Sequence, residues 1–190
     1  MWNHLSDLTG YAAIRLPLQR ACHPGEITLD LPGYQQLDSY SCGAVAAAMV
    51  VKFLRPAMGF ERIYAAVNPH RKYGTATSRA IRGMRSLGIR VSRKTNLTFD
   101  DLGAAIDAGH PVMVCVTTNE NGTDHWVVIY GYGRRPNLVF VAGQGWPFVV
   151  RHRMPWQKFR RRWSPAGDGL VCWKAKHRKP RPSRRVCQKK

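Results

Sequence analysis

The stretch from Asp38 to Val50 reads DSYSCGAVAAAMV, and it places a single cysteine, Cys42, at the head of a long apolar run. The run is stopped by Pro56, which predicts a helix over residues 42–54. Its centre, AVAAAMVVKFL, is apolar on nearly every face, so this helix should be buried in the core. The fold is expected to form around it.

A cysteine at a helix start has two interpretations. Unpaired backbone amides and the helix dipole favour negative charge there, which lowers the pKa of a thiol and makes its sulfur a usable nucleophile. Gly43, the next residue, would leave room for a substrate backbone to approach. Cysteine is, however, among the residue types most often buried in protein cores. Position alone leaves both interpretations of Cys42 open.

The rest of the chain predicts helices first and strands second. Thr98 can cap a helix, with Asp101 three residues on in a capping-box arrangement. Short β-branched or aromatic runs follow, separated by Gly, Pro and Asn, and they indicate an antiparallel sheet. This order is typical of the α+β class. The expected helices span 61–66, 77–87 and 98–109, and the expected strands span 27–31, 111–117, 126–132, 138–142 and 147–151.

Charge divides the chain into two regions. Residues 1–150 contain 15 Lys or Arg and 10 Asp or Glu, a net charge of +5, whereas residues 151–190 contain 15 Lys or Arg and one Asp, a net charge of +14. The sequence therefore predicts a globular domain over 1–150 and a basic, partly disordered C-terminal extension over 151–190.

The basic extension is either a solvated appendage or a handle for an anionic partner, which would be nucleic acid or a membrane surface. Aromatic and basic residues alternate within MPWQKFRRRW. Such a segment can stack on bases or lie at a lipid interface. It can also dock on the domain as a terminal helix that buries Trp156, Phe159 and Trp163.

Several classes of protein are disfavoured. No apolar run approaches the roughly 20 residues of a membrane span. The N-terminal stretch has no basic region followed by an apolar core, so we expect a cytoplasmic protein without a secretory signal. Five cysteines without a CxxC pair argue against a disulfide framework or a zinc site, and we expect no cofactor. Cys115 lies in the apolar run PVMVCVT and is expected in the core.

Two further residues favour the nucleophile interpretation of Cys42. Gln36 lies six residues upstream, and thiol hydrolases of the papain type use a glutamine amide, with the cysteine N–H, to bind the developing oxyanion. His125 opens the strand DHWVVIYGY, where a rigidly held imidazole suits a general base for a thiol on a distant helix. The order glutamine, cysteine, histidine is the papain order.

These motifs resemble the bacteriocin-leader-processing cysteine peptidases, family thirty-nine of that class, and their stand-alone relatives. The resemblance spans roughly residues 33–150 and rests on YQQLDSYSCGAVAAAMV, LGAAIDAGHPVMVCV, DHWVVIYGY and VFVAGQGWP. It implies a papain-like fold, in which a helical half carrying the cysteine packs on an antiparallel sheet carrying the histidine. It also implies Cys42 as nucleophile, His125 as base and Gln36 as oxyanion donor, or Gln35 if the register slips by one.

The third catalytic position departs from the family pattern. Family members have an aspartate before a proline, or an asparagine in papain relatives, after the histidine strand, and this group orients the imidazole. The matching stretch here, VFVAGQGW, offers only Gln144. A glutamine lacks the charge that stabilises imidazolium, so we expect reduced activity. Asp124 adjoins His125, but on a strand it should point to the opposite face.

The sequence thus favours a cysteine peptidase that acts on a peptide or protein through an acyl-enzyme. One alternative is a catalytically weak or inactive peptidase fold that binds peptides, because the residue at the third position is atypical. Another is a nucleic-acid-associated protein that acts through residues 151–190.

Overall fold

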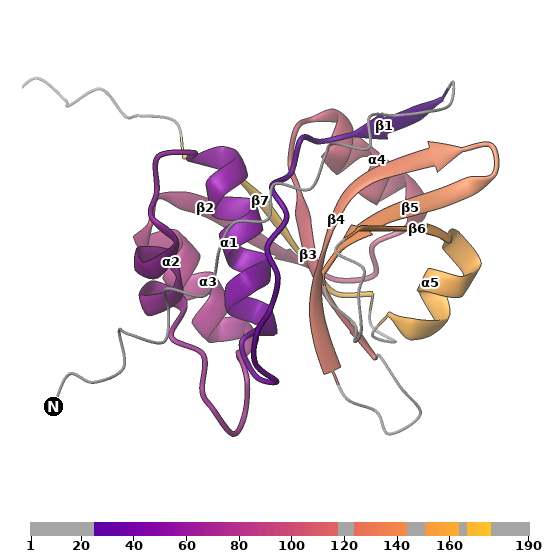
Figure 1. Cartoon of the computed structure of the whole chain (residues 1–190). Helices are drawn as coiled ribbons and strands as arrows, with labels where there is room; N and C mark the ends of the chain where they lie inside the picture. The colour runs from indigo at the N-terminus through magenta and orange to yellow at the C-terminus, as the bar shows by residue number, and fades with distance from the viewer. Residues whose placement is uncertain (1–24, 118–123, 144–150, 164–166, 176–190) are drawn as a thin grey trace, which may run out of the picture.

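The apolar run that begins at Cys42 forms helix α1, which lies between helices α2 and α3 and the sheet (Figure 1). The computed structural model describes residues 25–117, 124–143, 151–163 and 167–175. The helices are α1 (Cys42–Leu54), α2 (Phe60–Val67), α3 (Thr77–Ser86), α4 (Phe99–Asp107) and α5 (Trp156–Arg162). The strands are β1 (Glu26–Thr28), β2 (Ile89–Lys94), β3 (Val112–Thr117), β4 (Asp124–Arg134), β5 (Asn137–Ala142), β6 (Arg151–Pro155) and β7 (Gly169–Lys174).

The strands form one antiparallel sheet in the order β2-β7-β3-β4-β5-β6, and β1 pairs with β4. Helices α1, α2 and α3 gather on one side of the sheet, and α5 lies beside β5 and β6 (Figure 1). Helices therefore precede most of the strands and pack on an antiparallel sheet, as the sequence predicts for the α+β class.

Two hydrophobic clusters lie on opposite faces of the sheet. The first joins α1, α2 and α3 to sheet residues that include Trp126 and Val128. The second joins α4 and α5 to sheet residues that include Val127 and Ile129. Because side chains alternate along a strand, consecutive residues of β4 enter different clusters. This alternation decides which residues of β4 can face α1.

Helix α1 lies in the first cluster, and every residue from Gly43 to Val51 is buried. A helix that is apolar on all sides needs such complete cover, since any exposed face would leave hydrophobic surface in water. The helix bounds expected from the sequence, 42–54, are those observed. Helices α2, α3 and α4 also match their expected ranges to within one or two residues.

The expected boundary at residue 150 does not coincide with the end of the sheet. Strand β7 lies between β2 and β3, so residues 169–174 are an inner strand of the sheet. Helix α5 docks through Phe159 and Trp163, which are buried. This is the docked alternative for the aromatic segment, stabilised by burial of its rings. Residues 176–190, and the expected strand residues 147–150, lie outside the described residues.

Strands β2 and β7 were not expected from the sequence. In β2 the buried Ile89 and Val91 alternate with polar residues, and the strand is at the edge of the sheet. Cys172, which the sequence places in a basic extension without a role, is fully buried in β7. The charges that flank each short strand hide the apolar alternation.

Removal of the α4 cap tests whether the capping box of Thr98 and Asp101 stabilises this helix. The Thr98 side chain accepts a hydrogen bond from the Asp101 amide, and the Asp101 carboxylate accepts one from the Thr98 amide at 2.8 Å. Thr98→Ala removes the hydroxyl that caps the helix. We expect the free energy of unfolding to fall by about 1 kcal/mol in denaturant titration. Thr77→Ala, at the start of α3 where no side-chain cap is formed, should change it less.

Candidate active site

A turn anchored by Asp38 leads into α1. The Asp38 carboxylate accepts hydrogen bonds from the backbone amides of Tyr40 at 2.9 Å and Ser41 at 2.7 Å. Ser41 occupies the N-cap position, but its side chain forms no capping bond. The Asp38 carboxylate therefore fixes the approach to the helix, as aspartate commonly does in such turns.

Gln36 is held in the same turn. Its side-chain amide donates to the carbonyl oxygen of Asp38 at 2.6 Å, and the residue is half-buried. Gln35, the alternative oxyanion donor, is half-buried beside it. The turn thus brings the expected donor amide to the segment that enters α1 at Cys42.

Cys42 is half-buried, and the groups around its thiol have opposing effects on its pKa. Backbone amides of Trp126, Gly43 and Cys42 itself lie against the sulfur and favour the thiolate. Burial and, to a smaller extent, the charge of Asp38 favour the thiol, and burial is the largest effect. The pKa of Cys42 is therefore raised, where the sequence predicted a lowered value. The helix-terminus argument omits the desolvation that the sheet imposes.

His125 is the second residue of β4 and is half-buried. Its Nε2 atom is buried and has no hydrogen-bond partner among the described residues. Burial lowers the pKa of His125 below its ordinary value. The ring is therefore neutral at pH 7, the state in which an imidazole can accept a proton.

Cys42 and His125 come to the same end of the molecule, where α1 begins and β4 begins (Figure 1). The Cys42 thiol lies against the amide of Trp126, one peptide unit from His125. Alternation along β4, however, puts Trp126 on the face covered by α1 and His125 on the other face. Among the described residues the buried Nε2 of His125 has no hydrogen-bond partner, so the thiol does not donate to it. The structure brings the two residues near each other without joining their side chains.

Thr75 completes the surroundings of the α1 start, although no sequence pattern indicates it. The indole nitrogen of the buried Trp126 donates to the Thr75 carbonyl oxygen at 2.9 Å. A Cβ placed on Gly43 would lie 2.5 Å from the Cβ of Thr75. Gly43 is thus needed for packing against Thr75, and it does not open space for a substrate backbone as expected. A buried tryptophan predicts some acceptor for its N–H, although not which one.

The remaining expected residues fall in different places. Gln144, the proposed orienting residue, lies outside the described residues. Asp124 is exposed and, by alternation, lies on the face opposite His125. Cys115 pairs with Trp126 across β3 and β4, and burial raises the pKa of its thiol to about 12. Cys115 packs against the first cluster, in keeping with a core role.

Within the described residues no three His, Cys, Asp or Glu side chains are grouped so that they could hold a metal ion. No helix in that part of the chain has the length and apolarity to cross a bilayer.

The pH dependence of Cys42 alkylation follows from the pKa shifts of Cys42 and His125. Because the pKa of the thiol is raised and that of His125 is lowered, both groups are neutral at pH 7 in the absence of substrate. We expect the rate of alkylation by iodoacetamide to keep rising with pH beyond 9. A plateau already reached below pH 7, as a thiolate–imidazolium pair would give, would contradict this. Peptide mapping of the adduct against pH measures the rate at this cysteine alone.

The comparisons with known proteins concern the sequence and the fold. The model of the Peptidase C39-like family matches residues 28–171. A search of the curated proteins gives no match.

Three solved structures share the fold. A double-glycine-motif protease from an AMS/PCAT transporter, in complex with the leader peptide, gives a TM-score of 0.60 at 17% identity, covering 78% of this chain and 94% of that one. The peptidase domain of Streptococcus ComA, a bifunctional ABC transporter of a quorum-sensing pathway, gives 0.60 at 19%, covering 81% and 100%. A Bacillus anthracis protein described as C39-like peptidase gives 0.61 at 16%, covering 78% and 98%.

At these identities the likeness concerns the fold. The helical half that carries Cys42 packs on the antiparallel sheet that carries His125, which is the papain-like arrangement of those structures. The fold expected from the sequence is thereby confirmed.

Proposed function

The chain belongs to the Peptidase C39-like family, and on that premise we propose that it is a cysteine peptidase with Cys42 as nucleophile and His125 as base. The observation that carries the proposal is the meeting of the α1 start with the β4 start. There the thiol is in contact with the amide next to His125, whose buried Nε2 has no partner among the described residues. An unpartnered buried nitrogen costs stability, which functional sites tolerate.

The reaction divides into two steps. The Cys42 sulfur attacks the carbonyl carbon of the scissile peptide bond, and its proton passes to the His125 ring. The oxyanion is held by the Cys42 amide and the side-chain amide of Gln36. The imidazolium then protonates the leaving amine, which departs and leaves a thioester on Cys42. Water, deprotonated by His125, attacks the thioester and releases the acid and the free thiol.

The neutral state of both groups sets the order of proton movement. A buried thiol beside a neutral imidazole loses its proton as the bond to carbon forms, and not before substrate binds. For the reaction, the His125 ring must come within hydrogen-bond distance of the sulfur. Gln144 is proposed to orient the ring by accepting its second N–H.

We propose the substrate class from a protein that shares this fold. A related structure contains a leader peptide bound to a double-glycine-motif protease. Peptides that end in Gly-Gly before the scissile bond are therefore the first substrates to test. Glycine has no side chain, and it suits a site where Cys42 is half-buried and the neighbouring Gly43 is already packed against Thr75.

An electrophilic peptide tests the nucleophile directly. Peptides with mixed upstream sequences, a Gly-Gly end and a C-terminal nitrile would be incubated with the protein, and the adduct mapped by mass spectrometry. The thiol adds across the nitrile to form a thioimidate, and its proton moves through His125 to the nitrogen. We expect the adduct at Cys42, formed about 10² to 10³-fold more slowly in His125→Ala. An adduct that forms equally fast without His125 would overturn the assignment of the base.

A non-catalytic peptide-binding module is the second candidate, and a specific observation favours it. The thiol is neutral and the described residues do not link it to the imidazole. In that case the Gly-Gly peptides bind, as measured by calorimetry, but no adduct and no cleavage occur. The same nitrile experiment therefore separates the two candidates.

A further inference from the structure

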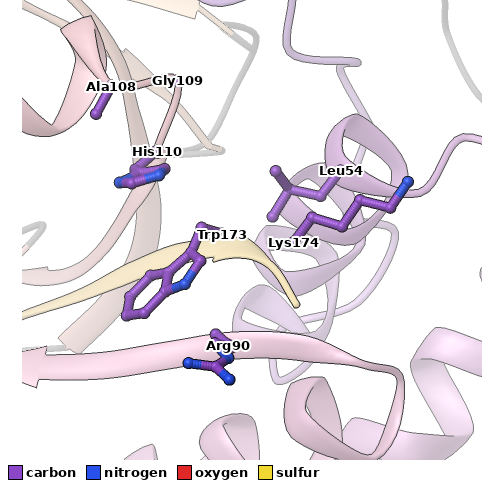
Figure 2. A pocket seen from close by; sticks show the side chains of 7 residues that line it. All are labelled: Leu54, Arg90, Ala108, Gly109, His110, Trp173 and Lys174. Atoms are coloured by element: carbon purple, nitrogen blue, oxygen red, sulfur yellow. The ribbon is translucent and has the colours of Figure 1, made fainter. Parts of the chain in front are cut away.

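A hollow lies far from Cys42, at the opposite end of α1. It has a volume of about 520 Å³ and is lined by Leu54, Arg90, Trp173, Lys174 and the turn at residues 108–110 (Figure 2). Leu54 ends α1 and Cys42 begins it, so the two sites are separated by roughly 18 Å of helix. The hollow is therefore not part of the candidate active site.

The hollow presents a flat aromatic surface. The half-buried indole of Trp173 lies between the His110 ring and the Arg90 side chain (Figure 2). The centroids of the Trp173 and His110 rings are 5.6 Å apart, and the rings are inclined by 33°. Arg90 is the cross-strand partner of Trp173, so the β2–β7 register fixes their proximity. An aromatic ring held in this way can stack on another planar ring only on the face that the His110 ring does not approach.

The rim of the hollow is cationic. Arg90 and Lys174 are both exposed, and none of the residues that line the hollow is acidic. The nearest acidic residue in sequence, Asp107, accepts hydrogen bonds from the Tyr132 hydroxyl at 2.9 and 3.1 Å. The two cations therefore face a site without a carboxylate of its own. They would attract an anion.

The charge of the chain increases where it leaves the hollow. Lys174 is the last residue of β7, and residues 176–190 contain eight Lys or Arg and no Asp or Glu. Chain continuity thus places a strongly basic segment directly after the aromatic site.

We propose that this hollow, named here the Trp173 site, binds single-stranded nucleic acid. Trp173 stacks on a base, while Arg90 and Lys174 contact the flanking phosphates. Combining an aromatic platform with cations is how proteins bind single strands without sequence preference. An acidic peptide would use the cations but would gain little from the half-buried Trp173 ring.

Binding of a labelled oligothymidylate to the full chain, measured by fluorescence anisotropy, tests the proposal. We expect binding that weakens as salt rises, because phosphate contacts release counterions. Trp173→Leu should weaken it by about tenfold, in line with the loss of one stacked base. Arg90→Gln should reduce the slope of log affinity against log salt by about one.

Two controls distinguish base stacking on Trp173 from general attraction between charges. An abasic strand of equal length keeps the phosphates and lacks the bases, so it should bind about tenfold more weakly and be insensitive to Trp173→Leu. Arg161→Gln removes an exposed charge on α5, at the opposite edge of the sheet from β2, and should leave the stacking contribution unchanged. Arg90→Gln and Lys174→Gln alter only exposed side chains, so they test the site even if Trp173→Leu fails to fold.

Equal binding of the abasic strand, or equal losses in Trp173→Leu and Arg161→Gln, would overturn the proposal. Polyglutamate that binds as tightly as the oligonucleotide would also overturn it, and would indicate an acidic protein partner. Cleavage of Gly-Gly peptides is a separate readout, since Cys42 is at the other end of α1. Loss of one activity in a variant therefore leaves the other measurable.

Discussion

Cys42→Ala is expected to abolish cleavage of the Gly-Gly peptides proposed above, with a fall in kcat of about 10⁴-fold or more. The alanine side chain has no atom that could attack the carbonyl carbon, so no acyl-enzyme forms. Peptide binding should survive, because the oxyanion donors and the turn at Asp38 remain. Mass spectrometry of the peptide products against time measures the loss, and calorimetry measures the binding.

Cys115→Ala is the matched control for this experiment. Cys115 is also half-buried, and it lies opposite Trp126 across β3 and β4, so its thiol is close to the same stretch of β4. The mechanism gives this thiol no role, and burial keeps its pKa near 12. We expect cleavage within about twofold of the unmodified protein. If both variants cleave equally well, Cys42 is not the nucleophile.

Sequence patterns located the helices well because their signals are local. Pro56 ends the run that starts at Cys42, and Thr98 with Asp101 caps α4 as predicted. Strands β2 and β7 were not predicted from the sequence, because the strands with which they pair are distant in sequence. Ile89 pairs with Lys174, 85 residues later, and no local pattern identifies that contact. The charge of the final 40 residues also suggested an appendage, where the structure has an inner strand.

The chemistry of the site was harder to predict than its residues. The sequence indicates a cysteine at a helix start, but the direction of its pKa shift depends on burial under the sheet. Likewise, the reason for Gly43 lies in Thr75, which a separate loop brings against α1. Both properties arise from contacts between segments far apart in sequence, and a pattern in one segment cannot contain them.

Gly43→Ala is expected to have the largest effect on stability among the site variants that leave Cys42 in place. The new Cβ would lie 2.5 Å from the Cβ of Thr75 and 2.8 Å from its Oγ1. Each Cβ is bonded directly to the backbone, so rotation of a side chain cannot relieve the contact. We expect a loss of about 1–3 kcal/mol of unfolding free energy, read from denaturant titration. Displacement of Thr75 should also slow cleavage, since its carbonyl holds the Trp126 indole.

Gly103→Ala gives the matched comparison. Gly103 is also a buried helical glycine, but the nearest atoms to an added Cβ are 3.5 Å away, at ordinary contact distance. Alanine has the higher helix propensity, so this variant should be more stable by about 0.5–1 kcal/mol. A double-mutant cycle then tests whether the contact with Thr75 causes the loss of stability in Gly43→Ala. Thr75→Gly deletes the atoms that the Gly43→Ala methyl meets, so the two changes together should cost less than their sum by about 1 kcal/mol. Strict additivity would mean that the cost of Gly43→Ala arises elsewhere, and that Thr75 does not set the position of the α1 start beside His125.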